Sequence, residues 1–130
     1  KGNSTPVTIT ATPKGGGVPL IYTFSVNTWF INNGSTVMPW SDASNWCTAQ
    51  ELAQPTRGDM TMGSGVRGLG SLFSEWGRMD NYSGSGFGSY TYWTSDEISS
   101  RYHYYVQLGN GLASSSGDAN GLYVVCRQGL

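Results

Sequence analysis

The sequence predicts a small α+β domain, and three features of the 130-residue chain support this prediction. Several short segments alternate apolar and polar residues, as half-buried β-strands do. The segment 41–53 instead repeats its apolar residues at helical spacing. The segment from Gly58 to Gly88 is so rich in glycine that it excludes long regular elements and predicts a wrapped loop.

Two strands are expected before the helix. The segment 7–12 alternates cleanly, and the sequence PKGGGVP at 13–19 then predicts a turn or short linker. The alternation returns at 22–26 and continues through 29–31 to a turn at 32–34. The first strand is expected either to belong to a preceding domain or to be added to this one.

The helix predicted over 41–53 places Ala43 and Cys47 on one buried face. Ser41 is its expected N-cap, and Pro55 stops it. A second short helix is predicted to start at Thr56, because a hydroxyl residue followed three positions later by an acid fits a capping box.

Three strands are predicted in the last third of the chain, at 89–94, 103–108 and 122–127. Asn-Gly pairs at 110–111 and 120–121 are turn signals between the last two. The serine-rich segment 114–117 is expected to be a flexible turn.

Composition excludes several classes of protein. Aromatic residues make up 13% of the chain, which argues against disorder. No apolar run approaches the roughly 20 residues of a membrane helix. The net charge is −1, and the few basic residues are scattered, so a nucleic-acid partner is not expected.

The two cysteines, Cys47 and Cys126, are far apart in the sequence and have no nearby histidine or second cysteine. They are too few to hold zinc, which leaves either two buried thiols or one long-range disulfide. Few charges, many glycines and tyrosines, and a possible disulfide are typical of an extracellular domain.

A series of short motifs between residues 22 and 126 occurs in a familiar order. They are Tyr22-Thr23-Phe24, Trp29-Phe30, Trp46-Cys47, Gln54-Pro55-Thr56-Arg57, Arg67-Gly68, Ser74-Glu75-Trp76-Gly77, Tyr92-Trp93-Thr94-Ser95 and Tyr123-Val124-Val125-Cys126. Together they resemble the C-terminal C-type lectin-like domain of the intimin and invasin family of bacterial outer-membrane adhesins, the inverse autotransporters. The resemblance implies two short helices packed on small antiparallel sheets, a long glycine-rich loop and a Cys47–Cys126 disulfide.

The resemblance also implies an organisation and a function. Residues 21–130 would be the lectin-like domain, and residues 1–20 a terminal strand and linker from a preceding immunoglobulin-like module, or an added strand. The domain would be a monomeric tip on the bacterial cell surface, held at the outer membrane only through upstream regions. It would bind a host protein, either a cell-surface receptor or an immunoglobulin.

The sequence departs from the sugar-binding lectins, because it lacks their Glu-Pro-Asn or Gln-Pro-Asp and Trp-Asn-Asp triplets. The nearby oxygen ligands are Asp118 and Asn120, with Asp96 and Glu97 earlier in the chain. Calcium prefers six or more oxygens, so neither a calcium site nor any other metal or cofactor is expected. A calcium-independent glycan lectin and a purely structural cap remain alternatives.

No pattern predicts an enzyme. The single histidine, His103, has no spaced nucleophile and acid beside it, and is expected to face solvent or a partner from a strand. Asp96 and Glu97 are adjacent, and adjacent carboxylates do not flank a substrate as those of a glycosidase do.

Aromatic residues among glycine and serine predict the contact face, because this composition is typical of binding loops. The expected face combines the loop 80–90, residues 101–103 and the turn 117–120. Its candidate ligand-binding residues are Asn81, Tyr82, Phe87, Tyr90, Arg101, Tyr102, His103, Asp118 and Asn120. Four tryptophans are instead assigned to the core: Trp29, Trp46, Trp76 and Trp93.

The tripeptide Arg57-Gly58-Asp59 matches the integrin-binding motif, but short motifs match by chance. The capping-box pattern at Thr56 is the favoured interpretation, because a capped helical turn presents Arg57 and Asp59 poorly to an integrin.

Overall fold

All 130 residues are described by the computed structural model of the chain, and they divide into two units. One contains Lys1–Trp29 with Gln128–Leu130, and the other contains Phe30–Arg127. No helix in either unit has the length and apolar character needed to cross a membrane.

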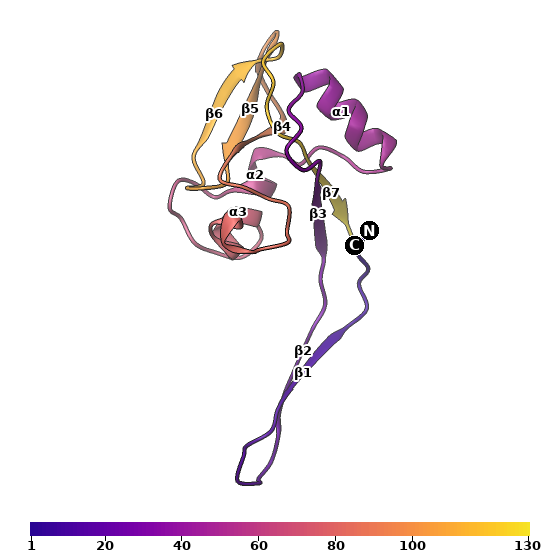
Figure 1. Cartoon of the computed structure of the whole chain (residues 1–130), viewed down its shortest axis with the longest axis vertical. Helices are drawn as coiled ribbons and strands as arrows, with labels where there is room; N and C mark the ends of the chain where they lie inside the picture. The colour runs from indigo at the N-terminus through magenta and orange to yellow at the C-terminus, as the bar shows by residue number, and fades with distance from the viewer. The chain divides into compact units, whose positions relative to one another are not determined.

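The first unit is built around a two-stranded antiparallel hairpin of β1 (Val7–Ala11) and β2 (Leu20–Phe24), labelled in Figure 1. Its register places one apolar set of side chains on a single face, in the cross-strand pairs Val7–Phe24, Ile9–Tyr22 and Ala11–Leu20. The other face contains threonines, two of which, Thr8 and Thr23, share a hydrogen bond of 3.1 Å. Both strands are exposed along their length, so nothing in this unit covers the apolar face.

The second unit contains a three-stranded antiparallel sheet in the order β4-β5-β6. These strands are β4 (Thr91–Ser99), β5 (Tyr102–Gln107) and β6 (Ala113–Gly117). A two-stranded sheet pairs β3 (Thr28–Asn32) with β7 (Val125–Gly129), and the residues of both strands are divided between the two units. The helices are α1 (Trp40–Ala49), α2 (Arg57–Met60), α3 (Leu72–Trp76) and the 3₁₀ turn η1 (Met79–Asn81).

Two hydrophobic clusters cover opposite faces of the three-stranded sheet. Tyr92 and Val106 are cross-strand partners and belong to one cluster, with residues of the glycine-rich segment such as Leu72. Trp93 belongs to the other, and its cross-strand partner Tyr105 packs against that cluster. Because neighbouring residues of a strand point to opposite faces, the alternation of β4 places one large aromatic ring in each cluster.

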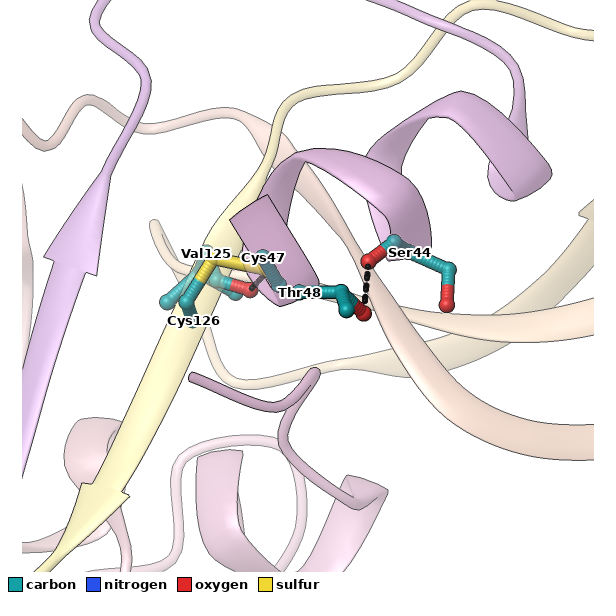
Figure 2. Close-up of a disulfide and its surroundings, with 5 residues drawn as sticks. All are labelled: Ser44, Cys47, Thr48, Val125 and Cys126. Carbon is teal, nitrogen blue, oxygen red and sulfur yellow. Dashed lines mark hydrogen bonds between the residues drawn. A yellow bond between two sulfur atoms is a disulfide. The ribbon is translucent and has the colours of Figure 1, made fainter. Parts of the chain in front are cut away.

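The Cys47–Cys126 disulfide predicted by the resemblance is present and joins α1 to β7, as Figure 2 shows. The two Cα atoms are 5.5 Å apart, and both cysteines are fully buried. On the same helix the Thr48 hydroxyl donates to the Ser44 carbonyl at 3.0 Å. The bridge therefore fixes the one long helix against the last strand from inside the second cluster.

The predicted helix boundaries differ from those observed. The first helix starts at Trp40 with Pro39 as its N-cap, so Ser41 lies inside it and its prediction as N-cap is wrong. It also ends at Ala49, well before Pro55, because Glu51 adopts the left-handed conformation with φ 59°. The second predicted helix is confirmed as α2.

Three other segments differ from their predicted structure. The segment predicted as a continuous alternation from 22 to 31 forms β2 and β3, which lie in different sheets. Helix α3 forms inside the glycine-rich segment, between Gly70 and Gly77. The segment 114–117, expected to be a flexible turn, is most of β6, because its pairing with β5 outweighs the low strand propensity of serine and glycine.

Four tryptophans were expected in the core, and this expectation is confirmed in full only for Trp93. Trp93 has no exposed surface, whereas Trp29 is 42% and Trp76 is 55% exposed. Trp46 is partly buried and packs against the second cluster. The aromatic residues of the short helix α3 therefore divide between the core and the surface, with Phe73 inside and Trp76 outside.

Candidate functional site

The predicted contact residues separate into two groups at opposite ends of the β4-β5-β6 sheet. Tyr102 begins β5, while the Tyr90 carbonyl accepts a hydrogen bond from Leu108, just beyond the other end of that strand. Six strand residues place these ends about 17 Å apart. The Tyr82 end contains Asn81, Tyr82, Phe87 and Tyr90. The Asp118 end contains Arg101, Tyr102, His103, Asp118 and Asn120.

At the Asp118 end, His103 is part of a buried polar cluster. Its Nδ1 lies 2.7 Å from Asp118 Oδ1, and its ring stacks on Trp40 with 3.6 Å between centroids. The Trp40 Nε1–H donates to the Thr94 carbonyl at 2.9 Å. His103 is only 6% exposed, so the expectation that it faces solvent or a partner is wrong. The imidazole and the Asp118 carboxylate instead join β5, the turn after β6 and the start of α1.

The other residues of this end are nearer the surface. Tyr102 is half exposed, and Arg101 adopts a left-handed backbone conformation with φ 69° in the turn before β5. The Asn120 side-chain amide donates to the Ser116 hydroxyl at 2.9 Å. The exposed residues of the Asp118 end are therefore Arg101, Tyr102 and Asn120, beside the His103–Asp118 pair.

At the Tyr82 end, Tyr82 forms an aromatic pair with Trp76. The rings meet edge to face with 6.0 Å between centroids, and the tyrosine hydroxyl donates to the Trp76 carbonyl at 2.7 Å. Both side chains are about half exposed. Trp76 was missed as a candidate because its motif assigned it to the core. The polar neighbours and the following Gly77 were weak signals of its surface position.

Phe87 and Tyr90 hold the rest of this loop to the sheet. Phe87 is partly buried and lies 5.6 Å from the Tyr92 ring, while Tyr90 stacks on Tyr123 at 4.2 Å and keeps one side exposed. The Tyr92 hydroxyl accepts a hydrogen bond from the Gly88 N–H at 3.0 Å. Burial raises the pKa of Tyr92, which keeps this phenol neutral in the folded chain.

Asn81 lies exposed in η1, next to a local ion pair. The guanidinium of Arg78 donates two hydrogen bonds to the Asp80 carboxylate, the shorter at 2.7 Å. These bonds lower the pKa of Asp80. The ion pair is local, between two residues at the start of the loop 80–90.

The Arg-Gly-Asp tripeptide forms the first turn of α2 and has a complete capping box. Thr56 Oγ1 accepts from the Asp59 N–H at 3.1 Å, and Asp59 Oδ2 accepts from the Thr56 N–H at 2.8 Å. The other Asp59 oxygen lies 3.4 Å from Arg127 Nε. The predicted capping interpretation is confirmed, and the Asp59 carboxylate is occupied by it.

Replacing Thr56 with alanine is expected to lower the free energy of unfolding by about 1 kcal/mol, because the Asp59 N–H loses its hydrogen bond to the Thr56 hydroxyl. Urea unfolding followed by tryptophan fluorescence measures this change. Thr56→Ser retains the hydroxyl and is the matched control. Equal stability of the alanine and serine variants would contradict a capping role.

Oxygen ligands do not gather in a cluster suited to a metal. Asp96 accepts a hydrogen bond from the Arg57 N–H at 2.7 Å, and Asp118 is bound to His103. No three His, Cys, Asp or Glu side chains lie together in a way that would hold a metal ion.

Comparison with known proteins relates the chain to bacterial adhesins. No protein-family model matches it. The chain is 37% identical over 123 residues to the inverse autotransporter adhesin YeeJ of Escherichia coli strain K12, a match covering 94% of the chain but 5% of that relative. The chain therefore spans only a small part of the protein it matches.

Two solved structures share the fold. The crystal structure of invasin, described as a bacterial integrin-binding protein, aligns with a TM-score of 0.79 and 23% identity, over 99% of this chain and 26% of that one. An intimin mutant from EHEC O157:H7 aligns with a TM-score of 0.62 and 19% identity, over 97% of this chain and 65% of that one. The chain is thus a homologue of a segment of an inverse autotransporter adhesin, with the C-type lectin-like fold of invasin and intimin.

Proposed function

We propose that the chain is the receptor-binding tip of a bacterial surface adhesin of the intimin and invasin type, and that it binds a host protein without catalysis and without calcium. The homology to an inverse autotransporter adhesin supports the adhesive role. The single most informative structural observation is the exposed Trp76–Tyr82 pair. Aromatic side chains that are rigid, exposed and beside polar loops are typical anchors of protein interfaces.

The Tyr82 end is the proposed centre of the contact. Tyr82 is fixed by its hydrogen bond to the Trp76 carbonyl, so little side-chain entropy is lost when a partner covers the ring. Phe87 packs on Tyr92 and Tyr90 stacks on Tyr123, which holds the rest of the loop to the sheet, and Asn81 is the exposed residue before Tyr82. Exposed aromatic rings of this kind are enriched at the centres of binding interfaces.

The Asp118 end is proposed as a second, weaker part of the contact. Its exposed groups are Arg101, Tyr102 and Asn120, while His103 and Asp118 act as positioning residues. The distance between the ends is within the width of a standard interface of about 800 Å² per partner. A folded host protein therefore has the size needed to reach both ends.

Calcium independence is proposed because the candidate oxygen ligands already have partners within the chain. Asp118 is bound to His103, and the Asn120 amide to Ser116. A calcium ion would need to displace these bonds and still find further carboxylates.

The domain is proposed to be a monomer at the bacterial cell surface, attached to the outer membrane by upstream regions. Residues 1–20 are proposed to be a terminal strand and linker from a preceding immunoglobulin-like module, or an added strand of this domain. The uncovered apolar face of the β1–β2 hairpin supports this, because a two-stranded hairpin is marginal in water unless another layer covers it.

Capture of host proteins by the oxidised chain, from cell-surface extract and from serum, tests the proposal. A single host protein identified by mass spectrometry and retained in EDTA would support it. An immunoglobulin captured from serum would identify that alternative partner. Elution by free sugars or loss after deglycosylation would instead show a glycan lectin, whose sugars would stack on the exposed rings.

Trp76→Ala and Tyr82→Ala are each expected to weaken binding of the captured protein by about 30-fold or more, the effect of losing an interface hot spot. Tyr82→Phe retains the ring and is expected to lose much less. Trp29→Ala removes a tryptophan of similar exposure in the other unit and is the matched control. Surface plasmon resonance measures all four variants. Unchanged affinity in both alanine variants would exclude the Tyr82 end as the contact.

A further inference from the structure

The outer edge of β6 is an unprotected strand edge, and it lies at the margin of the β4-β5-β6 sheet in Figure 1. Its residues are Ala-Ser-Ser-Ser-Gly, with no lysine, no proline and no bulge in its pairing with β5. These are the devices by which proteins normally block pairing with another chain. Their absence makes the edge available to an added strand.

The hydrogen bonds at both ends of β6 determine which backbone groups point outward. Gln107 donates to the Leu112 carbonyl at 2.8 Å, and Asp118 donates to the Arg101 carbonyl at 2.9 Å. Because bonded and non-bonded positions alternate in an antiparallel pair, 114 and 116 also bond to β5. The N–H groups of Ala113, Ser115 and Gly117 therefore point outward, as do the carbonyls of Ala113 and Ser115, and none of these groups has a partner in the chain.

A pocket lies beside this edge. Its volume is about 350 Å³, and it is lined by Arg57, Thr61, Met62, Gly63 and Ala113. Ala113 thus belongs both to the pocket wall and to the row of outward groups. A strand added to β6 would place its alternate side chains next to the pocket.

The pocket has one charged group, the Arg57 guanidinium. It lies 4.4 Å from the centre of the Tyr104 ring and makes no hydrogen bond or ion pair within the chain. Tyr104 is the cross-strand partner of Ser115, so the cation lies on the face of the sheet to which Ser115 points. An unpaired guanidinium beside an apolar wall favours a carboxylate over a neutral or basic side chain.

We infer that the β6 edge and the Arg57 pocket form a binding site for an extended acidic peptide segment of a partner protein. The peptide would add a strand antiparallel or parallel to β6, with backbone hydrogen bonds to Ala113, Ser115 and Gly117. One of its Asp or Glu side chains would enter the pocket and pair with Arg57. This site shares no residue with the Tyr82 end and does not rest on its proposed role, although Ala113 pairs with Val106 at the same end of the sheet.

The test begins with a phage-displayed library of random linear 12-residue peptides, selected on the whole oxidised chain. Enrichment of β-forming sequences that contain Asp or Glu is expected. In NMR spectra of the ¹⁵N-labelled chain, a synthetic copy of such a peptide is expected to shift the amides of Ala113, Ser115 and Gly117 and slow their exchange. Failure to enrich any peptide, or shifts confined to the Tyr82 end, would overturn the proposal.

Two substitutions separate the parts of the site. Ser115→Pro removes an outward N–H at an edge position that tolerates proline, and is expected to weaken peptide binding at least tenfold, while Ser115→Ala binds normally. Arg57→Gln is expected to weaken binding of the acidic peptide at least fivefold. It is expected to leave unchanged the binding of the same peptide with glutamine in place of the acidic residue. Thermal melts establish that each variant is folded. If Ser115→Pro does not fold, the amide shifts of the unmodified chain on peptide addition test strand addition instead. Equal binding by the folded proline variant and the parent would contradict strand addition.

Discussion

Replacing Cys47 and Cys126 together with alanine is expected to lower the free energy of unfolding by about 4 kcal/mol. The disulfide closes a loop with a sequence separation of 79, so its removal releases a large conformational entropy in the unfolded chain. For a domain of this size the melting temperature is expected to fall by roughly 12–20 °C. Calorimetry and guanidinium unfolding of the parent and the double variant measure the change.

Reduction of the parent provides the control for this prediction. Dithiothreitol is expected to lower the stability of the parent toward that of the double variant and to leave the variant itself unchanged. Both sulfur atoms are fully buried beside Val124 and Trp93, so reduction is expected to be slow until the chain opens. A loss below about 1 kcal/mol in the double variant would show that the two hydrophobic clusters hold α1 against β7 without the bridge.

Trp93→Ala is expected to cost about 4 kcal/mol of stability, within the range for truncating a fully buried aromatic residue. The Trp93 ring has no exposed surface and fills the cluster that contains the disulfide. Its Nε1–H also donates to the Met38 carbonyl at 2.9 Å, and that carbonyl would lose a partner. Urea unfolding at equilibrium measures the loss.

Trp76→Ala is the matched control, because it removes the same side chain from the surface of the same unit. Its cost is expected to be below about 1 kcal/mol, since most of the ring is already in water. A cost for Trp76→Ala close to that of Trp93→Ala would mean that Trp76 is covered in solution. That result would also remove the main support for the Tyr82 end as a contact.

Much of the fold could be predicted from local sequence patterns. The alternation at 7–12 and 103–108, the helical spacing around Cys47 and the capping box at Thr56 each depend on neighbouring residues alone. The strand β6 could not be predicted in this way, because serine and glycine form it only through pairing with β5. The same is true of α3, whose Leu72 and Phe73 are held by the core and not by helix propensity.

The candidate site was harder to predict than the fold, because exposure depends on tertiary packing. Composition alone did not distinguish His103, which is buried against Trp40, from Tyr102, which is half exposed one residue earlier. The position of Trp76 in a framework motif suggested a core residue, but only the backbone path of α3 shows that it points outward. Sequence order also could not show that the two groups of contact residues lie at opposite ends of one sheet.

The disulfide also determines how the second unit would bear mechanical load. Under the proposed function, tension between the upstream chain and a partner held at Tyr82 enters through β3 and reaches α1. At Cys47 the load divides, because one path follows the backbone toward Tyr82 and the other crosses the sulfur bridge and returns through β4 from Cys126. Both paths must be disrupted before Tyr82 can separate from β3. The bridge therefore shares a pulling force that the backbone between Cys47 and Tyr82 would otherwise bear alone.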